Sequence, residues 1–214
     1  MLSTLIDFIL HIDTHLIQIV NNFGDSTYFI LFLIIFIETG AVILPFLPGD
    51  SLLFAASALA ANPKYHLSIW VFGLTFLIAC LLGDSLNFFI GQRIGKSLSN
   101  HSLFGKLIDK ESLAKTEKFF EKHGAPAIIL ARYMPIIRTF APFAAAGSGF
   151  PYKHFFRFSI IGCISWVLIC CSAGYFFGNI PFVQEHFSLI IIGIIVVSLI
   201  PAIVGYLRSK LAHK

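Results

Sequence analysis

The chain has 214 residues, of which 57% are hydrophobic and only 12% are charged, and its formal net charge is +4. Soluble domains carry roughly 25% charged residues, so this composition, with a mean hydropathy of +0.86, excludes an ordinary soluble protein. It indicates an all-α integral membrane protein.

Residues 1–22 form the first predicted element, a short amphipathic helix. Asp7, His11, His15 and Gln18 recur three or four residues apart, which is the spacing of a polar stripe on a helix. Such a helix is suited to lying in the membrane interface. His11 and His15 also have the spacing of two metal ligands, but no further ligands cluster near them. We therefore interpret the stripe as a solvated face and expect no metal and no other cofactor.

Residues 28–61 are predicted to form a re-entrant helical hairpin. The first apolar piece is marginal for crossing a bilayer, because a transmembrane helix needs about 20 residues. Pro45 and Pro48, followed by Gly49, then interrupt the helix. The apolar stretch that resumes at 52–61 is too short to cross. Two short apolar pieces around a Pro-Gly break favour a segment that enters the membrane and returns.

The rest of the chain repeats this pattern, with a second broken segment followed by long apolar runs. Pro135, Pro142 and Gly147 interrupt the second segment as Pro45, Pro48 and Gly49 interrupt the first. The predicted elements are a transmembrane helix at 67–92, a cytoplasmic basic segment at 93–124, a second re-entrant hairpin at 126–149, and transmembrane helices at 155–178 and 187–207.

The distribution of Lys and Arg predicts the orientation of these elements. Basic residues gather in 93–124 and at the C-terminus, and the positive-inside rule places both in the cytoplasm. The tract is better suited to anionic lipid than to nucleic acid, so no nucleic-acid partner is expected. The span ends NFFIG and GYFFG also resemble each other. Residues 1–214 are therefore predicted to form one polytopic domain, an inverted repeat with two opposed hairpins and about three full transmembrane helices.

Four ionisable residues lie beside the predicted helix breaks. Glu38 and Asp50 belong to the first hairpin, and Arg132 and Arg138 belong to the second. A charge at the bilayer centre costs about 2.5–3.5 kcal/mol, so these groups must be paired or must line a wet cavity. Two guanidinium groups suit a phosphate, which arginine binds in a bidentate manner. A carboxylate that alternates between a protonated state and an arginine-paired state can carry a proton.

Other readings of these residues remain open. The charges can be structural ion pairs in a non-catalytic membrane-organising protein, or they can serve a proton-dependent transporter of a small solute or ion. An enzyme is not expected, because the histidines are scattered singly and no nucleophile–base–acid set is evident. Asp84 and Asn87, near the end of the span at 67–92, are secondary candidates for the functional site. For Asp84, a role at the helix end or the membrane interface is at least as suitable as proton transfer.

Two glycine pairs and the cysteines have simple packing explanations. The cysteines all lie in apolar spans and are interpreted as small packing residues. Close helix packing is expected at two pairs with small-x-x-x-small spacing, which are Gly91/Gly95 and Gly174/Gly178.

Around the ionisable residues and the helix breaks, the chain closely resembles the bacterial DedA family, which is related to the eukaryotic VTT-domain (SNARE-associated) lipid scramblases. The stretches ETGAVILPFLPGDSLLF and ILARYMPIIRTFAPFAAAGSG match two family signatures, and GDSLNFFIGQRIG and AGYFFG also fit. The resemblance covers nearly the whole chain and lies close to the protein after which the family is named. It implies two opposed re-entrant hairpins, with the family's essential acids at Glu38 and Asp50 and its essential arginines at Arg132 and Arg138.

The resemblance also implies a function. Some members are implicated in returning the undecaprenyl phosphate carrier across the cytoplasmic membrane, and others are described as proton-dependent transporters. We therefore predict a multi-pass translocase of the bacterial inner membrane, a flippase or scramblase with a cytoplasmic C-terminus. Its substrate would be a phosphate-headed lipid, with undecaprenyl phosphate as the first candidate, and protons would drive it in support of envelope homeostasis. Homo-oligomerisation is left open.

Overall fold

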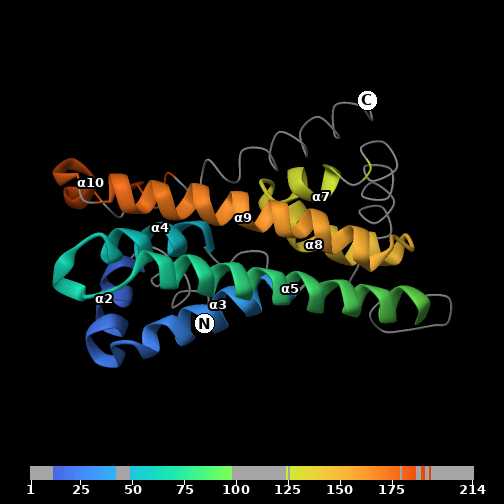
Figure 1. Cartoon of the computed structure of the whole chain (residues 1–214), viewed down its shortest axis with the longest axis horizontal. Coiled ribbons are helices and arrows are strands. Elements are labelled where there is room, and N and C mark those ends of the chain that lie inside the picture. Colours follow the sequence, from blue (N-terminus) through green and yellow to red (C-terminus); the bar gives the residue numbers. More distant parts are fainter. Residues whose placement is uncertain are drawn as a thin grey trace. The chain divides into compact units, whose positions relative to one another are not determined.

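The structure, a computed structural model, describes residues 12–41, 49–97, 124, 126–178, 180–186, 189–190 and 193 (Figure 1). All regular elements in these ranges are helical, which confirms the predicted all-α class. They are α2 (Ile12–Phe23), α3 (Ser26–Gly40), α4 (Gly49–Ala60), the 3-10 turn η1 (Pro63–Tyr65), α5 (Ile69–Ser97), α7 (Pro126–Ala131), α8 (Pro135–Gly147), α9 (Tyr152–Phe177) and α10 (Pro181–Glu185).

Two helices are long and apolar enough to cross a membrane, namely Ile69–Arg93 within α5 and Tyr152–Phe177. They lie where the sequence predicts spans, at 67–92 and 155–178. α9 begins directly after Pro151, a position before the helix where proline is well tolerated. Several predicted features lie wholly or mostly outside the described residues. These are residues 1–11 with His11, Pro45 and Pro48, most of the basic segment 93–124, and most of the third span at 187–207.

The exposed face of α5 is strongly apolar. Trp70, Leu74, Ile78, Leu82 and Leu86 recur every four residues and are 41–84% exposed. The buried face of the same helix carries polar side chains, including a carboxylate. Large contiguous apolar surfaces are rare on soluble monomers, so an apolar outside around a polar inside is the arrangement expected of a helix in lipid.

Both broken segments contain helices that are too short to cross a bilayer alone. α3 has 15 residues and α4 has 12, whereas a crossing needs about 20. α7 has 6 residues and α8 has 13. Pro135 does not lie inside the second break, because it is the first residue of α8, where its missing N–H costs nothing. Pro142 lies inside α8, and Gly147 ends it.

The chain divides into two compact units. Unit 1 comprises Met1–Ile35, Phe46–Ile78 and Ser165–Lys214, and unit 2 comprises Phe36–Pro45 and Ala79–Ile164. Among the described elements, α2, α4, η1 and α10 belong to unit 1 and α7 and α8 belong to unit 2, while α3, α5 and α9 contribute residues to both.

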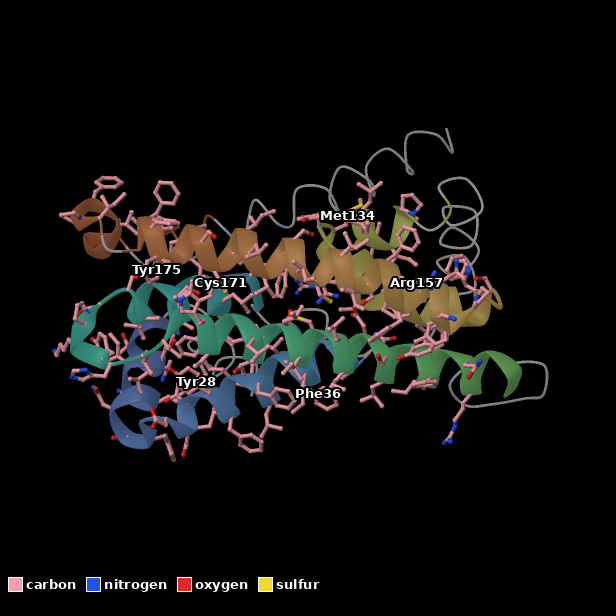
Figure 2. All side chains as sticks on the ribbon, in the orientation of Figure 1. Tyr28, Phe36, Met134, Arg157, Cys171 and Tyr175 are labelled. Carbon is pink, nitrogen blue, oxygen red and sulfur yellow. The ribbon has the colours of Figure 1, made fainter. Side chains whose placement is uncertain are left out.

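In unit 1, the start of α3 is attached to the start of α5. The hydroxyl of Tyr28 (Figure 2) accepts a hydrogen bond of 2.8 Å from the backbone N–H of Ser68. The Tyr28 ring lies 4.6 Å from the ring of Phe72 between centroids. The end of α9 packs on α4 at Gly174 and Gly178. A Cβ added at Gly174 would lie 2.2 Å from the Phe54 carbonyl oxygen, so only glycine permits this approach.

In unit 2, α8 packs on the end of α5 in the same manner. A Cβ added at Gly91 would lie 2.6 Å from the carbonyl oxygen of Phe143. Alanines on the buried face of α8, including Ala144 and Ala145, allow this close contact. The close packing expected at the glycine pairs is therefore confirmed at Gly91 and, in unit 1, at Gly174 and Gly178; the side-chain environment of Gly95 is outside the described set.

Candidate functional site

Unit 2 collects a group of buried polar side chains in its apolar interior. Glu38 comes from α3, Asp84 and Asn87 from α5, Arg132 from the turn after α7, and Arg138 from α8. Their exposed fractions range from 0% to 8%. An unpaired charge in such a place would be prohibitively costly, so the pairing of these groups decides what the site can do.

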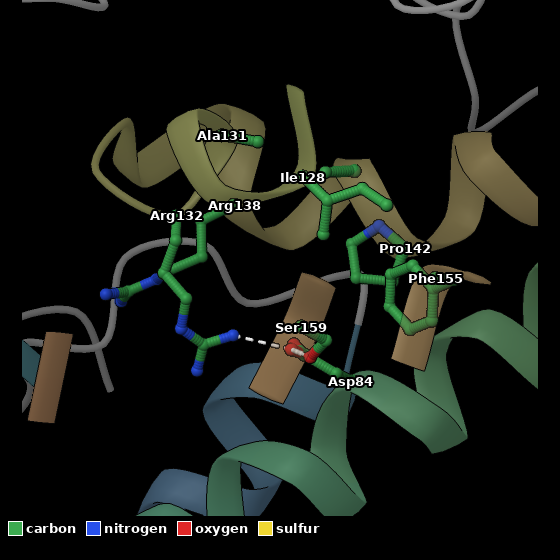
Figure 3. Close-up of a pocket in the computed structure, with 9 residues that line it drawn as sticks. Asp84, Ile128, Ala131, Arg132, Arg138, Pro142, Phe155 and Ser159 are labelled. Carbon is green, nitrogen blue, oxygen red and sulfur yellow. Dashed lines mark hydrogen bonds and ion pairs between the residues drawn. The ribbon is translucent and has the colours of Figure 1, made fainter. Parts of the chain in front are cut away.

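Arg132 is paired with Asp84. Its Nη1 atom donates to Asp84 Oδ2 at 2.6 Å. The same oxygen accepts from the Ser159 hydroxyl at 2.5 Å and from the Cys163 thiol at 3.6 Å. Figure 3 shows Arg132 extending towards Asp84 and Ser159. Asp84, predicted only as a secondary candidate, is thus in direct contact with one of the predicted phosphate-binding arginines.

Arg138 is paired with Glu38. The Nη2 atom of Arg138 donates to Glu38 Oε1. Arg138 lies in the first turns of α8, where its backbone N–H donates to the Met134 carbonyl at 2.7 Å. Since Pro135 starts the helix, it determines the position from which Arg138 projects towards the end of α3. The structure therefore joins a predicted proton-coupling acid with a predicted phosphate-binding arginine.

Both arginines line one small cavity in unit 2, and Asp84, Pro142 and Ser159 line it too (Figure 3). Its water-accessible volume is ≈ 10 Å³, which is room for about one water molecule. A phosphate group does not fit. The arginines are bound to carboxylates in this conformation, so an anionic ligand could reach them only after the ion pairs open.

Asp50, the other predicted acid, belongs to unit 1. The indole Nε1 of Trp166 donates to Asp50 Oδ1 at 2.9 Å. Asp50 also lies in the first turn of α4, where the partial positive charge of a helix N-terminus stabilises a carboxylate. Asp50 thus accepts from an indole at a helix N-terminus, whereas Glu38 and Asp84 accept from guanidinium groups.

Asn87 connects the two backbone segments that carry the Glu38–Arg138 pair. Its Nδ2 atom donates to the carbonyl of Thr39 at 3.1 Å and to the carbonyl of Thr139 at 2.8 Å. Thr39 follows Glu38, and Thr139 follows Arg138. One buried amide thus holds the end of α3 and the start of α8 at a fixed separation.

Replacing Asn87 with leucine is expected to destabilise unit 2 substantially. Both amide hydrogens would be lost, and each buried carbonyl left without its donor costs about 1–3 kcal/mol. The melting temperature in detergent should fall clearly, whereas leucine at the exposed Asn22 of α2 should leave it nearly unchanged. Equal melting temperatures for the two variants would show that the Asn87 hydrogen bonds contribute nothing.

Sequence reasoning did not identify Ser159 or the two threonine carbonyls. Ser159 had a usable signal, because a serine near the start of a predicted apolar span needs a hydrogen-bond partner. The threonine carbonyls had none, since backbone groups carry no sequence signature. Within the residues that the structure covers, no three His, Cys, Asp or Glu side chains gather as metal ligands.

Comparison with known proteins agrees with this picture. The VTT domain matches residues 47–176. The chain is 49% identical to "Protein DedA" of Escherichia coli K12 over 208 residues, which cover 97% of this chain and 94% of that protein. It is 41% identical to an uncharacterized membrane protein of Mycobacterium tuberculosis H37Rv (90% and 84% covered) and 32% identical to "Inner membrane protein YghB" of E. coli K12 (84% and 78% covered). No solved structure gives a significant match.

The family match extends across residues of both units. It includes Asp84, Arg132 and Arg138 of the two ion pairs, while Glu38 precedes the matched range. Relatives of this similarity are named as membrane proteins, in agreement with the two helices long and apolar enough to cross a membrane and with the apolar face of α5. The chain belongs to the DedA family of VTT-domain membrane proteins.

Proposed function

We propose that this protein is a transporter, not an enzyme, and that it moves a phosphate-headed lipid across the bacterial inner membrane. Undecaprenyl phosphate is the first candidate substrate. The observation that carries the proposal is the pair of buried arginines in unit 2, Arg132 and Arg138, each bound to a carboxylate and both lining one cavity. The family is commonly linked to membrane transport.

The proposed mechanism follows from what the arginines contact. Guanidinium groups bind phosphate oxygens in a bidentate manner, but here they are already bound to Asp84 and Glu38. A proton on a carboxylate removes its negative charge and weakens its hold on the arginine. A lipid phosphate can then replace the carboxylate, while the lipid tail stays in the bilayer. Loss of the proton restores the ion pair and expels the phosphate. Asp50 in unit 1, which accepts from the Trp166 indole, is the alternative to Glu38 as the proton-coupling acid.

The re-entrant hairpins and the inverted repeat are part of the proposal. α4 packs its backbone at Phe54 on Gly174 of α9, and α8 packs its backbone at Phe143 on Gly91 of α5. Both contact phenylalanines are followed by two alanines, and both contact glycines begin a small-x-x-x-small pair. The second helix of each short, broken segment thus packs on the end of a long helix by the same contact, which supports two related halves.

Location and partners complete the proposal. A relative named as an inner membrane protein supports the bacterial cytoplasmic membrane. A cytoplasmic C-terminus and a basic surface for anionic lipids follow from the positive-inside rule. Protons and membrane lipids would be the partners of transport, and the same chemistry is compatible with a monomer or a homo-oligomer.

The decisive experiment measures transbilayer movement of undecaprenyl phosphate in proteoliposomes, with and without a pH gradient. Arg132→Ala and Arg138→Ala should each slow movement by about tenfold or more, because a hydrogen bond to a charged group contributes about 1.5–3 kcal/mol. Arg157→Ala is the matched control, since Arg157 is exposed on α9 (Figure 2). Native-like movement by both cavity variants would disprove the phosphate site.

A second function is favoured by the size of the cavity. A water-accessible volume of ≈ 10 Å³ admits a water-sized species but not a headgroup in this conformation. A proton-dependent transporter of a small ion would need no larger opening. The same vesicles distinguish the two functions, because ion transport should follow the pH gradient in the absence of any phosphate-headed lipid.

A further inference from the structure

We propose that Asp84 is a second proton site of the transport cycle, so that two protons enter for each phosphate monoester headgroup bound. This inference rests on the proposed function, which supplies the phosphate and the proton coupling. It gives a definite proton-transfer role to a residue that the sequence offered only as a secondary candidate, and it adds a proton count and a preference for one class of headgroup.

The hydrogen bonds of Asp84 leave room for a proton. Oδ2 accepts from Arg132, Ser159 and Cys163. Oδ1 is buried and accepts no hydrogen bond from any part of the chain that the structure describes. A proton can therefore add to Oδ1 without displacing a donor from Oδ2. The Ser159 hydroxyl would continue to hold the neutral acid in place after the arginine has moved.

The other groups around Asp84 are cations and thiols. Arg132 faces it from the turn after α7, and Arg138 lines the same cavity from α8. Cys163 faces it from α9, and Cys80, on the same helix as Asp84, lies beside Cys163. Among the described residues that line this cavity, Asp84 is the one carboxylate. Protonation of Asp84 is therefore the direct way to make the cavity more positive.

The charges of the two ion pairs set the proton count. Arg132 with Asp84 and Arg138 with Glu38 are each neutral overall. A phosphate monoester carries a charge of about −1.5 to −2 at pH 7. One proton would release one guanidinium, which leaves a dianionic headgroup partly uncompensated in a buried site. Two protons release both guanidinium groups and match the dianion.

The cycle balances in protons and charge. One proton converts Glu38 from carboxylate to carboxylic acid, and another does the same for Asp84. The headgroup then binds to both arginines. When it leaves on the other side of the membrane, the same two protons dissociate and both ion pairs re-form. A phosphate diester, which carries a single negative charge, would require only one of these two steps.

The test is the pH dependence of the initial rate of lipid movement in proteoliposomes containing undecaprenyl phosphate. In the range where the rate falls with rising pH, the native chain should lose about two decades of rate per pH unit, because two protons are linked to the step. Asp84→Asn imitates the protonated acid and should reduce the slope to about one decade per unit. Asp25→Asn, at an exposed position in unit 1, should keep the native slope.

Three results of these rate measurements would contradict parts of the proposal. A native slope in Asp84→Asn, or a slope reduced by Asp50→Asn instead, would overturn the assignment of Asp84. Phosphatidylglycerol, a diester, should follow about one decade per pH unit if it moves at all. A diester that shows the same slope as the monoester would overturn the headgroup preference.

Proton uptake by Asp84 can also be measured without transport, so that this inference is tested separately from the proposed function. Infrared difference spectra of the protein in bilayers, recorded on acidification, should show the carbonyl stretch of newly formed buried carboxylic acids. Asp84→Asn should remove one component and Glu38→Gln another. If the spectrum of Asp84→Asn equalled that of the native chain, proton uptake by Asp84 would be refuted. If the spectrum lost a component in Asp84→Asn but the native chain moved no lipid, only the proposed function would be refuted.

Discussion

Replacing Gly174 with alanine is expected to prevent unit 1 from packing in its native arrangement. The added Cβ would lie 2.2 Å from the Phe54 carbonyl oxygen and 2.9 Å from the Phe54 Cα. Both are backbone atoms, so no side-chain rotation relieves the overlap. α9 and α4 would have to separate, with loss of the contacts along both helices. Overpacking of this kind costs about 1–3 kcal/mol and more where the backbone itself must move.

The measurement is the thermal unfolding of purified protein in detergent, together with the yield of monodisperse protein. Gly73→Ala is the matched control, because Gly73 lies inside α5 and a Cβ there would meet nothing within 4 Å. That control should equal or exceed the native stability, since alanine favours a helix over glycine by about 1 kcal/mol. Equal unfolding temperatures for Gly174→Ala and the native chain would contradict the packing of α9 on α4.

Replacing Arg138 with glutamine is expected to destabilise unit 2 and to abolish lipid movement, and adding Glu38→Gln should restore only the stability. Removing one partner of a buried ion pair costs about 3–5 kcal/mol, because the other charge remains buried. Neutralising both residues removes that penalty. Phosphate binding needs the guanidinium itself, so the double variant should fold but still fail to move the lipid.

This pair of variants separates the transport proposal from the membrane-organising reading. If Arg138 served only to hold α8 against α3, the double variant would recover function along with stability. Unfolding temperatures and lipid movement must therefore be measured on the same preparations. The exchange of partners Glu38→Arg with Arg138→Glu offers a further check, because it preserves the ion pair and should not preserve a phosphate site.

The helices of this protein could largely be predicted from the sequence. Continuous apolar runs longer than a bilayer is thick predicted the two long helices now seen as α5 and α9. Pro135 marked the interruption of the segment 126–149, although it begins α8 and does not lie inside the break. The interruption predicted at Pro142 is wrong, because α8 continues through that residue. These features are local, because helix length and proline chemistry depend on neighbouring residues alone.

The partners within the site could not be predicted. Arg132 lies 48 residues from Asp84 along the chain, and Arg138 lies 100 residues from Glu38. No periodicity connects such positions, so Asp84 stood only as a secondary candidate. The role of Asn87 was equally hidden, because its partners are backbone carbonyls that every residue possesses.

By itself, the sequence determined that this is a helical membrane protein of the DedA family, with ionisable residues placed beside proline-broken helices. Composition and local chemistry suffice for those conclusions, because lipid tolerates only helices with satisfied backbones and charges that find partners. Only the tertiary structure decided that Arg132 meets Asp84, that Arg138 meets Glu38 and that Asn87 holds the latter pair's backbones together. Those contacts depend on how α3, α5, α7 and α8 pack, which is a property of the folded chain.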